Sequence, residues 1–370
     1  MLSLGLTFAQ TTLYGNVDQA WNKVTVKSAG NTISDKTGFA PIQMGGGILG
    51  VRGSEDLSGG MKASYVIEMN PAIDGDSTGS IGMLNRQSFV GLSGAFGAVR
   101  IGKQYSNAFN NTVGVDPGGA TGIAGNASFC VLLAYTKCID GGDNPLRQAN
   151  SAQYDLPELV AGLKLGVTMV YGENDTANGA ANSGTGNGFN LSYSSGALYA
   201  GYTYDKVKNT PIGLLTTTGT TVTYPTTTTL LQTSTSPDVA AASTSNANKL
   251  TTMSASYDLG MAKIGISNTK MSVGSQSLDN TFGSVSVPFG GNANVWASMG
   301  KGSAYRADTS KSADHNSYQL GVNYGLSKRT VLYAQYGKLE LNSTANSATT
   351  ITSTSKVEVT GTALGVHHSF

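Results

Sequence analysis

The stretch Met61-Lys-Ala-Ser-Tyr-Val-Ile-Glu-Met69 decides the fold class of this chain. Apolar side chains occupy every odd position of the stretch, and polar or charged side chains occupy most of the even positions. Successive side chains of a β-strand point to opposite faces, whereas a helix repeats about every 3.6 residues. The alternation therefore predicts a strand with one apolar face and one polar face.

The same two-residue period recurs along the whole chain. It is clear in Leu13-Tyr-Gly-Asn-Val17 and in Leu332-Tyr-Ala-Gln-Tyr336, close to the two ends. No segment keeps a helical period for more than one or two turns. The sequence therefore predicts an all-β protein. We place sixteen strands, which begin near residues 11, 40, 60, 83, 98, 150, 163, 188, 197, 249, 261, 281, 293, 316, 329 and 356.

Short and long breaks take turns between these strands. The short breaks lie near residues 55–60, 93–97, 156–159, 194–196, 259–261 and 325–329, and the long breaks lie at 105–149, 173–187, 207–248, 302–315 and 340–355. Short turns on one rim and long loops on the other are typical of an outer-membrane β-barrel. The Thr-rich segment 207–248 is predicted to be an external loop, with a linker between domains as the alternative.

The composition excludes several classes of protein. The 370 residues are 12% charged with a net charge of +1, so no basic field is present for nucleic acid. No apolar run approaches the roughly 20 residues of a membrane helix, and the 49 glycines follow no collagen-like period. A transmembrane barrel stays compatible, because half of its strand side chains face away from lipid.

The N-terminus and the two cysteines indicate an exported chain. Residues 1–9 resemble the end of a signal peptide with cleavage after Ala9, which leaves 10–370 as the barrel; an ordinary chain end is the alternative. In an exported protein, Cys130 and Cys138 are expected to form a disulfide that closes a small loop. Two free thiols in a reducing cytosol remain the other interpretation. We predict no metal site, since the three histidines lie far from this pair.

Several segments resemble the general porins of Gram-negative bacteria, in particular their β-proteobacterial branch. They run in order from residue 13 to the closing Phe370, which suits an aromatic girdle. The segments are Leu13-Tyr-Gly-Asn-Val-Asp18, Gly50-Val-Arg-Gly-Ser-Glu-Asp-Leu-Ser-Gly-Gly-Met-Lys-Ala63, Asn85-Arg-Gln-Ser-Phe-Val-Gly-Leu-Ser-Gly-Ala-Phe-Gly97 and Ser327-Lys-Arg-Thr-Val-Leu-Tyr-Ala334.

The resemblance implies a 16-stranded antiparallel barrel, a homotrimer and an inward-folded third loop that narrows the channel. The third loop corresponds to 105–149, where the Cys130–Cys138 pair either limits its conformations or only trims a surface excursion. Anion-preferring members carry an arginine cluster, and Arg86 and Arg147 match two of its positions. The third position holds Ile48 here. The resemblance therefore implies a general diffusion porin with a weak anion preference.

Strand parity adds further candidates for the channel lining. If Phe89 and Gly91 face lipid, Arg86 faces the lumen, because a charge at mid-depth on the lipid face costs about 2–4 kcal/mol; a surface ion pair is the alternative for Arg86. The same reasoning directs Asp18, Arg52, Lys62, Glu68 and Arg100 inward. Asp116 in the third loop is a candidate for the acidic side of a transverse field.

Functions other than a diffusion channel have less support in the sequence. An outer-membrane enzyme needs a base near a nucleophile or water, and no such arrangement can be placed, so we predict no catalytic residues and no cofactor. A surface adhesin or receptor built on a barrel remains an alternative. A substrate-specific channel is another, with Tyr14, Trp21 and Tyr105 as candidate pore-side aromatics. The expected partners are outer-membrane lipid, lipopolysaccharide, ions and small hydrophilic solutes, and no nucleic acid.

Overall fold

The computed structural model describes most of the chain. The described residues are 10–41, 44, 47–71, 86–119, 121, 122, 124, 147–172, 185–208, 222–223, 232–233, 247–273, 276–305, 309–347 and 350–370. The predicted signal-peptide remnant 1–9, the cysteine pair Cys130 and Cys138, and nearly all of 207–248 lie outside these residues.

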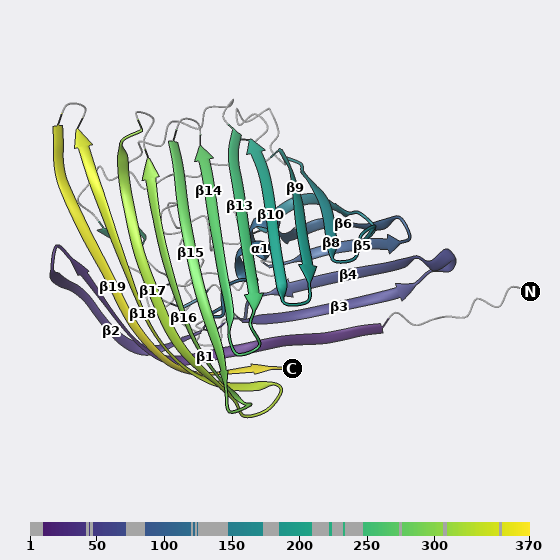
Figure 1. The fold of residues 1–370 in the computed structure, drawn as a ribbon, viewed down its shortest axis with the longest axis horizontal. Coiled ribbons are helices and arrows are strands. Elements are labelled where there is room, and N and C mark those ends of the chain that lie inside the picture. The colour runs from purple at the N-terminus through teal and green to yellow at the C-terminus, as the bar shows by residue number, and fades with distance from the viewer. Residues whose placement is uncertain are drawn as a thin grey trace, which may run out of the picture.

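The chain forms a closed antiparallel barrel, as the sequence predicted. One continuous sheet holds seventeen strand segments, and β1 pairs with β19 to close it (Figure 1). Because β2 and β3 both pair with β1 and follow each other along it, they make up one barrel strand, and the barrel has sixteen strands. The segments are β1 (Gln10–Ser28), β2 (Asn31–Pro41), β3 (Ile48–Asp56), β4 (Lys62–Met69), β5 (Ser88–Gly94), β6 (Gly97–Tyr105), β7 (Arg147–Asp155), β8 (Leu163–Val170), β9 (Gly186–Ser195), β10 (Leu198–Lys208), β13 (Ala247–Asp258), β14 (Lys263–Val273), β15 (Gln276–Phe289), β16 (Ala293–Tyr305), β17 (Lys311–Gly325), β18 (Thr330–Ser347) and β19 (Thr350–Ser369).

Four short elements complete the described structure. Helix α1 (Asn107–Val113) follows β6, and a single 3-10 turn, η1 (Ser58–Gly60), follows β3. Strands β11 (Val222–Thr223) and β12 (Gln232–Thr233) pair only with each other. Among the described residues, no helix is long and apolar enough to cross a membrane.

The two rims of the barrel carry connections of different length. On the rim where β1 begins and β19 ends, seven connections of two to seven residues join the strands: 57–61, 95–96, 156–162, 196–197, 259–262, 290–292 and 326–329. On the other rim the intervals between strands are 29–30, 70–87, 106–146, 171–185, 209–246, 274–275, 306–310 and 348–349. In outer-membrane barrels the short turns are periplasmic, so the second rim is the external one.

Two of the predicted long breaks are wrong. Most of 302–315 and 340–355 is strand, and the intervals between strands there shrink to 306–310 and 348–349. At 18 and 20 residues, β18 and β19 exceed the 9–11 residues that a tilted strand needs to cross a bilayer. Beyond the apolar band the inward face of these strands is apolar and the outward face is charged. Leu339 and Val359 are buried, while Lys338 and Glu358 face outward. Sequence reasoning missed these strand ends because no apolar outward face marks them.

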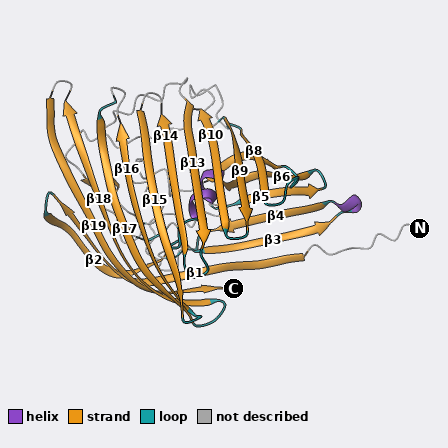
Figure 2. Ribbon diagram, in the orientation of Figure 1, coloured by secondary structure: helices purple, strands orange, loops and turns teal. Residues whose placement is uncertain are grey.

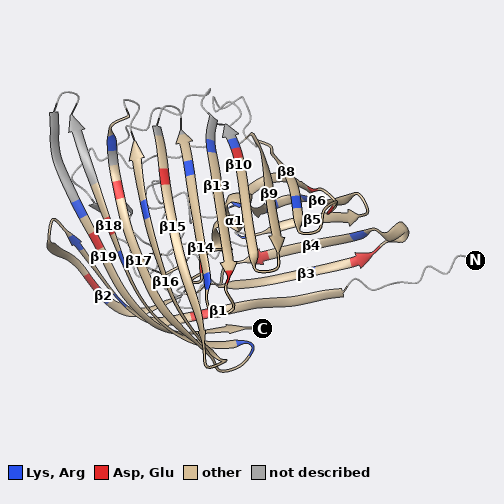
Figure 3. Ribbon diagram, viewed as in Figure 1, with Lys and Arg blue, Asp and Glu red and all other residues tan. Residues whose placement is uncertain are grey.

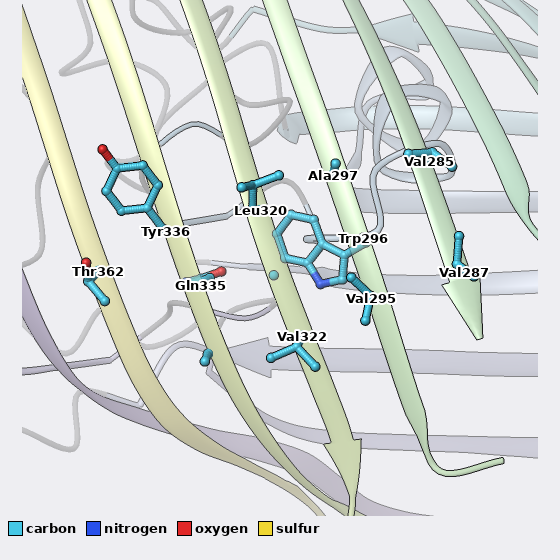
Figure 4. Close-up of a pocket in the computed structure, with 12 residues that line it drawn as sticks. Val285, Val287, Val295, Trp296, Ala297, Leu320, Val322, Gln335, Tyr336 and Thr362 are labelled. Atoms are coloured by element: carbon cyan, nitrogen blue, oxygen red, sulfur yellow. The ribbon is translucent and has the colours of Figure 1, made fainter. Parts of the chain in front are cut away.

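The lipid-facing side of the barrel is apolar and continuous. Large apolar side chains lie exposed at alternate positions, for example Val90, Ile101, Met253, Ile266 and Leu320. Strands β10 and β13 to β19 cross the front wall in Figure 1, and β1, β3 and β4 cross behind them at a steep angle, as expected for tilted strands (Figure 1). The outer wall over β15 to β19 holds a shallow apolar depression of about 460 Å³, lined by residues that include Val285, Val295, Leu320, Val322 and Tyr336 (Figure 4).

Candidate functional site

The described residues between 106 and 124, which we call the inner segment, leave the wall after β6 and run along the inside of the barrel. The segment begins with α1, whose first turn is capped by Ser106, since its Oγ accepts a hydrogen bond from the backbone NH of Phe109 at 3.1 Å. The helix lies within the barrel behind β10 and β13 (Figure 2). The interior position of these residues follows from their contacts with the buried, inward-facing side chains of the wall.

Hydrogen bonds attach this segment to several strands around the barrel. Asn107 donates to Oγ1 of Thr168 on β8 at 3.0 Å, and the Tyr199 hydroxyl of β10 donates to Asn111. Further along, Ser284 on β15 donates to the carbonyl of Val115 at 2.5 Å. The described part of the segment thus passes across the inner wall from β6 towards β17.

Gln319 on β17 forms the last described attachment. Its Oε1 accepts the backbone NH of Ala124 at 2.7 Å, and its Nε2 donates to the carbonyl of Thr121 at 3.3 Å. Gly122 lies between these two residues at φ +80°, and a Cβ there would lie 2.6 Å from Nε2 of Gln319. Only glycine allows both the left-handed backbone and this close approach.

A tryptophan supports the same region from the neighbouring strand. Trp296 on β16 is buried, and its indole lies over Gly321 of β17, where a Cβ would come within 2.3 Å of the ring. The other end of the indole reaches Gly118 of the segment. Gly321 therefore leaves room for the ring that the segment rests on.

The first part of the candidate site is a pair of arginines on either side of Tyr105, the last residue of β6. The guanidinium of Arg147 lies 5.0 Å from the centre of the Tyr105 ring, and the guanidinium of Arg86 donates a hydrogen bond to the Tyr105 hydroxyl. Phe109 of α1 stacks on the same ring with 4.9 Å between the centroids. The structure thus brings together two residues that are 61 positions apart in sequence.

Glu68 connects this pair to a third arginine. Its Oε2 lies 3.9 Å from Nε of Arg86, and its Oε1 accepts a 2.7 Å hydrogen bond from the Tyr14 hydroxyl. The guanidinium of Arg52 lies 4.6 Å from the centre of the Tyr14 ring. Arg52, Tyr14, Glu68, Arg86, Tyr105 and Arg147 form a continuous line on the inner wall, which we call the arginine track.

The arginine track carries a net positive charge. It holds three guanidinium groups and one carboxylate, and both Glu68 and Arg86 are largely buried against each other. Arg52 is exposed to the interior, and no described acidic group forms an ion pair with it. An excess of fixed positive charge beside a water-filled path raises the local concentration of anions.

Two other predicted cations lie away from the track. Arg100 on β6 faces inward and pairs with Asp155 at 2.7 Å. Lys62 begins β4 at the periplasmic rim, where its ammonium lies 3.2 Å from a carboxylate oxygen of Asp56. Both are therefore compensated by a neighbouring acid.

Two of the three predicted acidic lining residues, Asp18 and Asp116, are buried and accept hydrogen bonds. Asp18 accepts the Tyr333 hydroxyl at 2.5 Å and the backbone NH of Met44 at 2.7 Å, and only 1% of it is exposed. Asp116 accepts the backbone NH of Gly118 at 2.8 Å within the inner segment. Their carboxylates stabilise the nearby backbone through these hydrogen bonds. The alternation along a strand predicts only the direction of a side chain and does not reveal such bonds.

The predicted parity of β5 is wrong. Val90 pairs with Ile101, and both are exposed on the outer wall, whereas Phe89 and Gly91 face the interior beside Arg100. Arg86 nevertheless reaches the interior, because it precedes the strand at a bend. Both faces of this short strand carry a large apolar residue, so the alternation alone does not show which face points inward.

Sequence reasoning also missed residues of the site. Gln319 and Trp296 were not singled out, although the glycines at 118 and 122 in the predicted inner loop are a usable signal for close contacts. Tyr14 and Tyr105 lie inside, whereas Trp21 is exposed on the outer wall. Within the described ranges, no group of three or more His, Cys, Asp or Glu residues is arranged to hold a metal ion.

Comparison with known proteins decides the family. A family model described as Gram-negative porin matches residues 4–345. The chain belongs to the Gram-negative porin family. Outer membrane porin protein 32 of Delftia acidovorans is 28% identical to it over 346 residues, which cover 91% of this chain and 86% of that protein. The major outer membrane protein P.IB of Neisseria meningitidis serogroup B is 29% identical over 52% of this chain and 53% of its own length.

Solved porin structures share the fold. The anion-selective porin from Comamonas acidovorans superposes with a TM-score of 0.73 at 24% identity, over 98% of this chain and all of that one. OmpF of Salmonella typhi gives 0.66 at 14% identity over 98% of each chain. The family and its relatives are channels of the outer membrane. This porin accordingly lies in the outer membrane and allows the passive diffusion of ions and small hydrophilic solutes.

Proposed function

We propose that the arginine track lines the narrowest part of the channel and gives this general porin a weak preference for anions. The observation that carries the proposal is the placement of Arg86 and Arg147 on the two sides of Tyr105, with Glu68 as the one carboxylate of the track. The inner segment 106–124 starts directly after Tyr105, so the track lies where this segment reduces the cross-section. No catalytic step and no cofactor is part of the proposal.

The strength of the preference follows from what surrounds these arginines. Ile48, at the position where the resemblance to anion-preferring porins implies an arginine, faces the same side of the wall as Gly50 and Glu68 and adds no charge. Arg52 lies four residues further along β3 and brings its guanidinium to the track through Tyr14. The similar porin from Comamonas acidovorans is described as anion-selective, which supports the sign of the preference.

The test is the reversal potential of single channels in unequal KCl. A unit charge about 8 Å from a permeating ion in water contributes about 0.5 kcal/mol, or about twofold in permeability. Replacing both arginines by glutamine (Arg86→Gln with Arg147→Gln) should lower the chloride permeability about fourfold and shift the reversal potential towards cations. The lysine variants at the same two positions should keep the preference, because they keep the charge.

A matched control removes two cations elsewhere. Lys328 and Arg329 lie exposed in the turn 326–329 at the periplasmic rim. Replacing both by glutamine changes the net charge by the same amount, and we expect an unchanged reversal potential. If the two double variants shifted the potential equally, the preference would belong to the overall charge and not to the track.

Two further parts of the proposal concern assembly and the third loop. We propose a homotrimer, as in the trimer form of OmpT from Vibrio cholerae, which shares the fold at 13% identity and a TM-score of 0.60. Light scattering of the detergent-solubilised protein should give three chains per particle, and a stable monomer would contradict this.

A Cys130–Cys138 disulfide should limit the motion of the third loop, so its reduction should raise current noise. Unchanged traces would oppose that role.

A solute-specific channel is the second candidate function. Tyr14, Tyr105 and Phe109 lie inside the barrel close to cationic groups, which is an arrangement suited to a planar anion. Benzoate should then interrupt the chloride current at concentrations at which acetate has no effect. Equal effects of the two anions would leave the general diffusion porin as the better description.

A further inference from the structure

Asp205, on the inner face of β10, is the one buried acidic residue of the described structure without a partner. It is 3% exposed, and neither of its carboxylate oxygens forms a hydrogen bond or an ion pair with a described residue. The other buried acids, Asp18, Glu68 and Asp116, each accept at least one hydrogen bond. Acidic and basic residues lie side by side near the upper end of β10 in Figure 3. Because neighbours in a strand point to opposite faces, the adjacent Lys206 points away from the carboxylate.

The carboxylate of Asp205 lies over a glycine of the neighbouring strand. Asp205 pairs with Gly188 on β9, and Gly188 pairs with Thr168 on β8. A Cβ on Gly188 would collide with Oδ1 of Asp205 and would lie 3.0 Å from its Cγ. The side chain of Asp205 therefore leans along this row, and the glycine leaves the space that it occupies.

The inner segment covers this part of the wall. Asn107 donates to Oγ1 of Thr168 in the same row, and Asn111 accepts the hydroxyl of Tyr199, six residues before Asp205 on β10. Helix α1 as a whole packs against β10 and β13. A carboxylate enclosed in this way has lost its hydration, and buried charges in proteins are paired with another charge or coordinate a metal ion.

Two neutral side chains beside Asp205 also keep an oxygen atom without a partner. Gln148, near the start of β7, is 8% exposed; its amide approaches the carboxylate, and its Oε1 forms no hydrogen bond with a described residue. A half-turn of this amide exchanges its nitrogen and its oxygen, so either atom can face Asp205. Thr203 is 2% exposed and lies two positions before Asp205 on the same face of β10, and its Oγ1 has no partner either. Two carboxylate oxygens, one amide oxygen and one hydroxyl thus come together.

These are the atoms that calcium binds. Ca²⁺ takes about six to eight oxygen ligands from carboxylates, amide carbonyls and water in a flexible geometry, and a carboxylate with both oxygens available can bind it in a bidentate way. Mg²⁺ needs a near-ideal octahedron and keeps several waters. Transition metals prefer the nitrogen and sulfur ligands of His and Cys. A site with one acidic and two neutral residues also differs from clusters of three or more His, Cys, Asp or Glu residues, of which the described part of the chain holds none.

We propose that Asp205, Gln148 and Thr203 bind a calcium ion between β10 and the start of β7, with water completing its coordination. The ion provides the counter-charge that Asp205 lacks. Because Gln148 directly follows Arg147, the ion also restrains one end of the arginine track. A site with one carboxylate belongs to the weak class, with a dissociation constant of about 10⁻⁴–10⁻³ M. The proposal depends on the fold and is independent of the sign of the ion preference.

Equilibrium dialysis of the detergent-solubilised porin against radioactive calcium tests the proposal. After removal of metal ions with EDTA, the unaltered porin should bind about one ion per chain more than the Asp205→Asn variant. Thr203→Val should lower the affinity at least about tenfold, the smaller of the effects seen when a group that supports a metal site is lost. Magnesium at the same concentration should leave the calcium bound. Asp279→Asn is the matched control, because Asp279 faces outward and pairs with Lys270, and this variant should bind calcium as the unaltered porin does.

The unfolding temperature distinguishes a calcium site from a protonated carboxyl group. In EDTA, Asp205→Asn should unfold at the same temperature as the unaltered porin or at a higher one, since the amide removes an unpaired buried charge. Calcium at about ten times its dissociation constant should raise the unfolding temperature of the unaltered porin and leave that of the variant unchanged. Equal calcium binding by these two proteins, or displacement of calcium by an equal concentration of magnesium, would overturn the proposal. If the Asn variant does not fold, an unchanged affinity in Thr203→Val would overturn it instead.

Discussion

The side chain of Gln319 accepts a 2.7 Å hydrogen bond from the backbone NH of Ala124, across 195 residues of sequence. This bond joins the barrel wall to the segment that follows α1. The same amide also donates to the carbonyl of Thr121 and to Gln335 of β18. One wall residue therefore satisfies two backbone groups of the inner segment, and its amide forms the last described point of attachment.

Replacing Gln319 by alanine should loosen the inner segment. The buried groups left without partners cost about 1–3 kcal/mol, and the barrel sheet itself keeps its backbone ladder. We expect more frequent current fluctuations in single-channel recordings with little change in the thermal stability of the barrel. Ser298→Ala on the neighbouring strand is the control, because the Ser298 hydroxyl is buried on the same wall without a hydrogen-bond partner. Quiet traces from the Gln319 variant would show that this attachment is dispensable.

Gly321→Ala should displace the Trp296 ring. A methyl group would lie 2.3 Å from the indole carbons, and overpacking of this kind costs about 1–3 kcal/mol. The expected results are a lower unfolding temperature and an altered near-ultraviolet circular dichroism spectrum. Gly283→Ala on β15 is the matched control, since its nearest neighbouring atom lies 3.9 Å from the added carbon. A similar drop in unfolding temperature for the two variants would mean that Gly321 is needed for the conformation of the strand and not for the packing of Trp296.

Asp18→Asn should reduce stability without changing ion selectivity. The carboxylate is buried and accepts hydrogen bonds from Tyr333 and Met44, so its charge does not face the channel water. An amide can accept only one of these bonds well, and we expect a loss of about 1–3 kcal/mol in the free energy of unfolding. The reversal potential should stay within the error of the unaltered porin. A clear shift towards anions would instead show that Asp18 acts on the permeating ions.

Arg52→Gln should lower the anion preference by less than the Arg86 and Arg147 double variant. Its guanidinium lies over Tyr14 at the end of the arginine track and is exposed to the interior. One unit charge removed in water changes permeability about twofold or less. The reversal potential in unequal KCl measures this, with Arg329→Gln at the rim as the control. An effect larger than that of the double variant would move the selective region from Tyr105 to Tyr14.

Parts of the candidate site could be read from the sequence, and others could not. Arg86, Arg147, Arg52 and Glu68 were expected to face inward, and the structure places all four on one continuous line. Their connection through Tyr14 and Tyr105 could not be predicted, because it depends on the bend before β5 and on the register of β1 with β3. Asp18 was expected to line the channel, yet it is buried beneath residues that pack against it only after the barrel closes.

The sequence by itself determined the class of fold, the sixteen strands and the difference between the two rims. Each of these follows from a local requirement. Every strand that crosses the membrane must present alternate side chains to lipid, and the length of each connection can be read from the residues between two strands. Only the tertiary structure decided the orientation of β5, the polar strand ends of β18 and β19, and the course of residues 106–124. These features depend on contacts between residues far apart in the chain. A period of two does not say which face of a strand points inward, and a polar segment can lie inside the barrel as readily as outside.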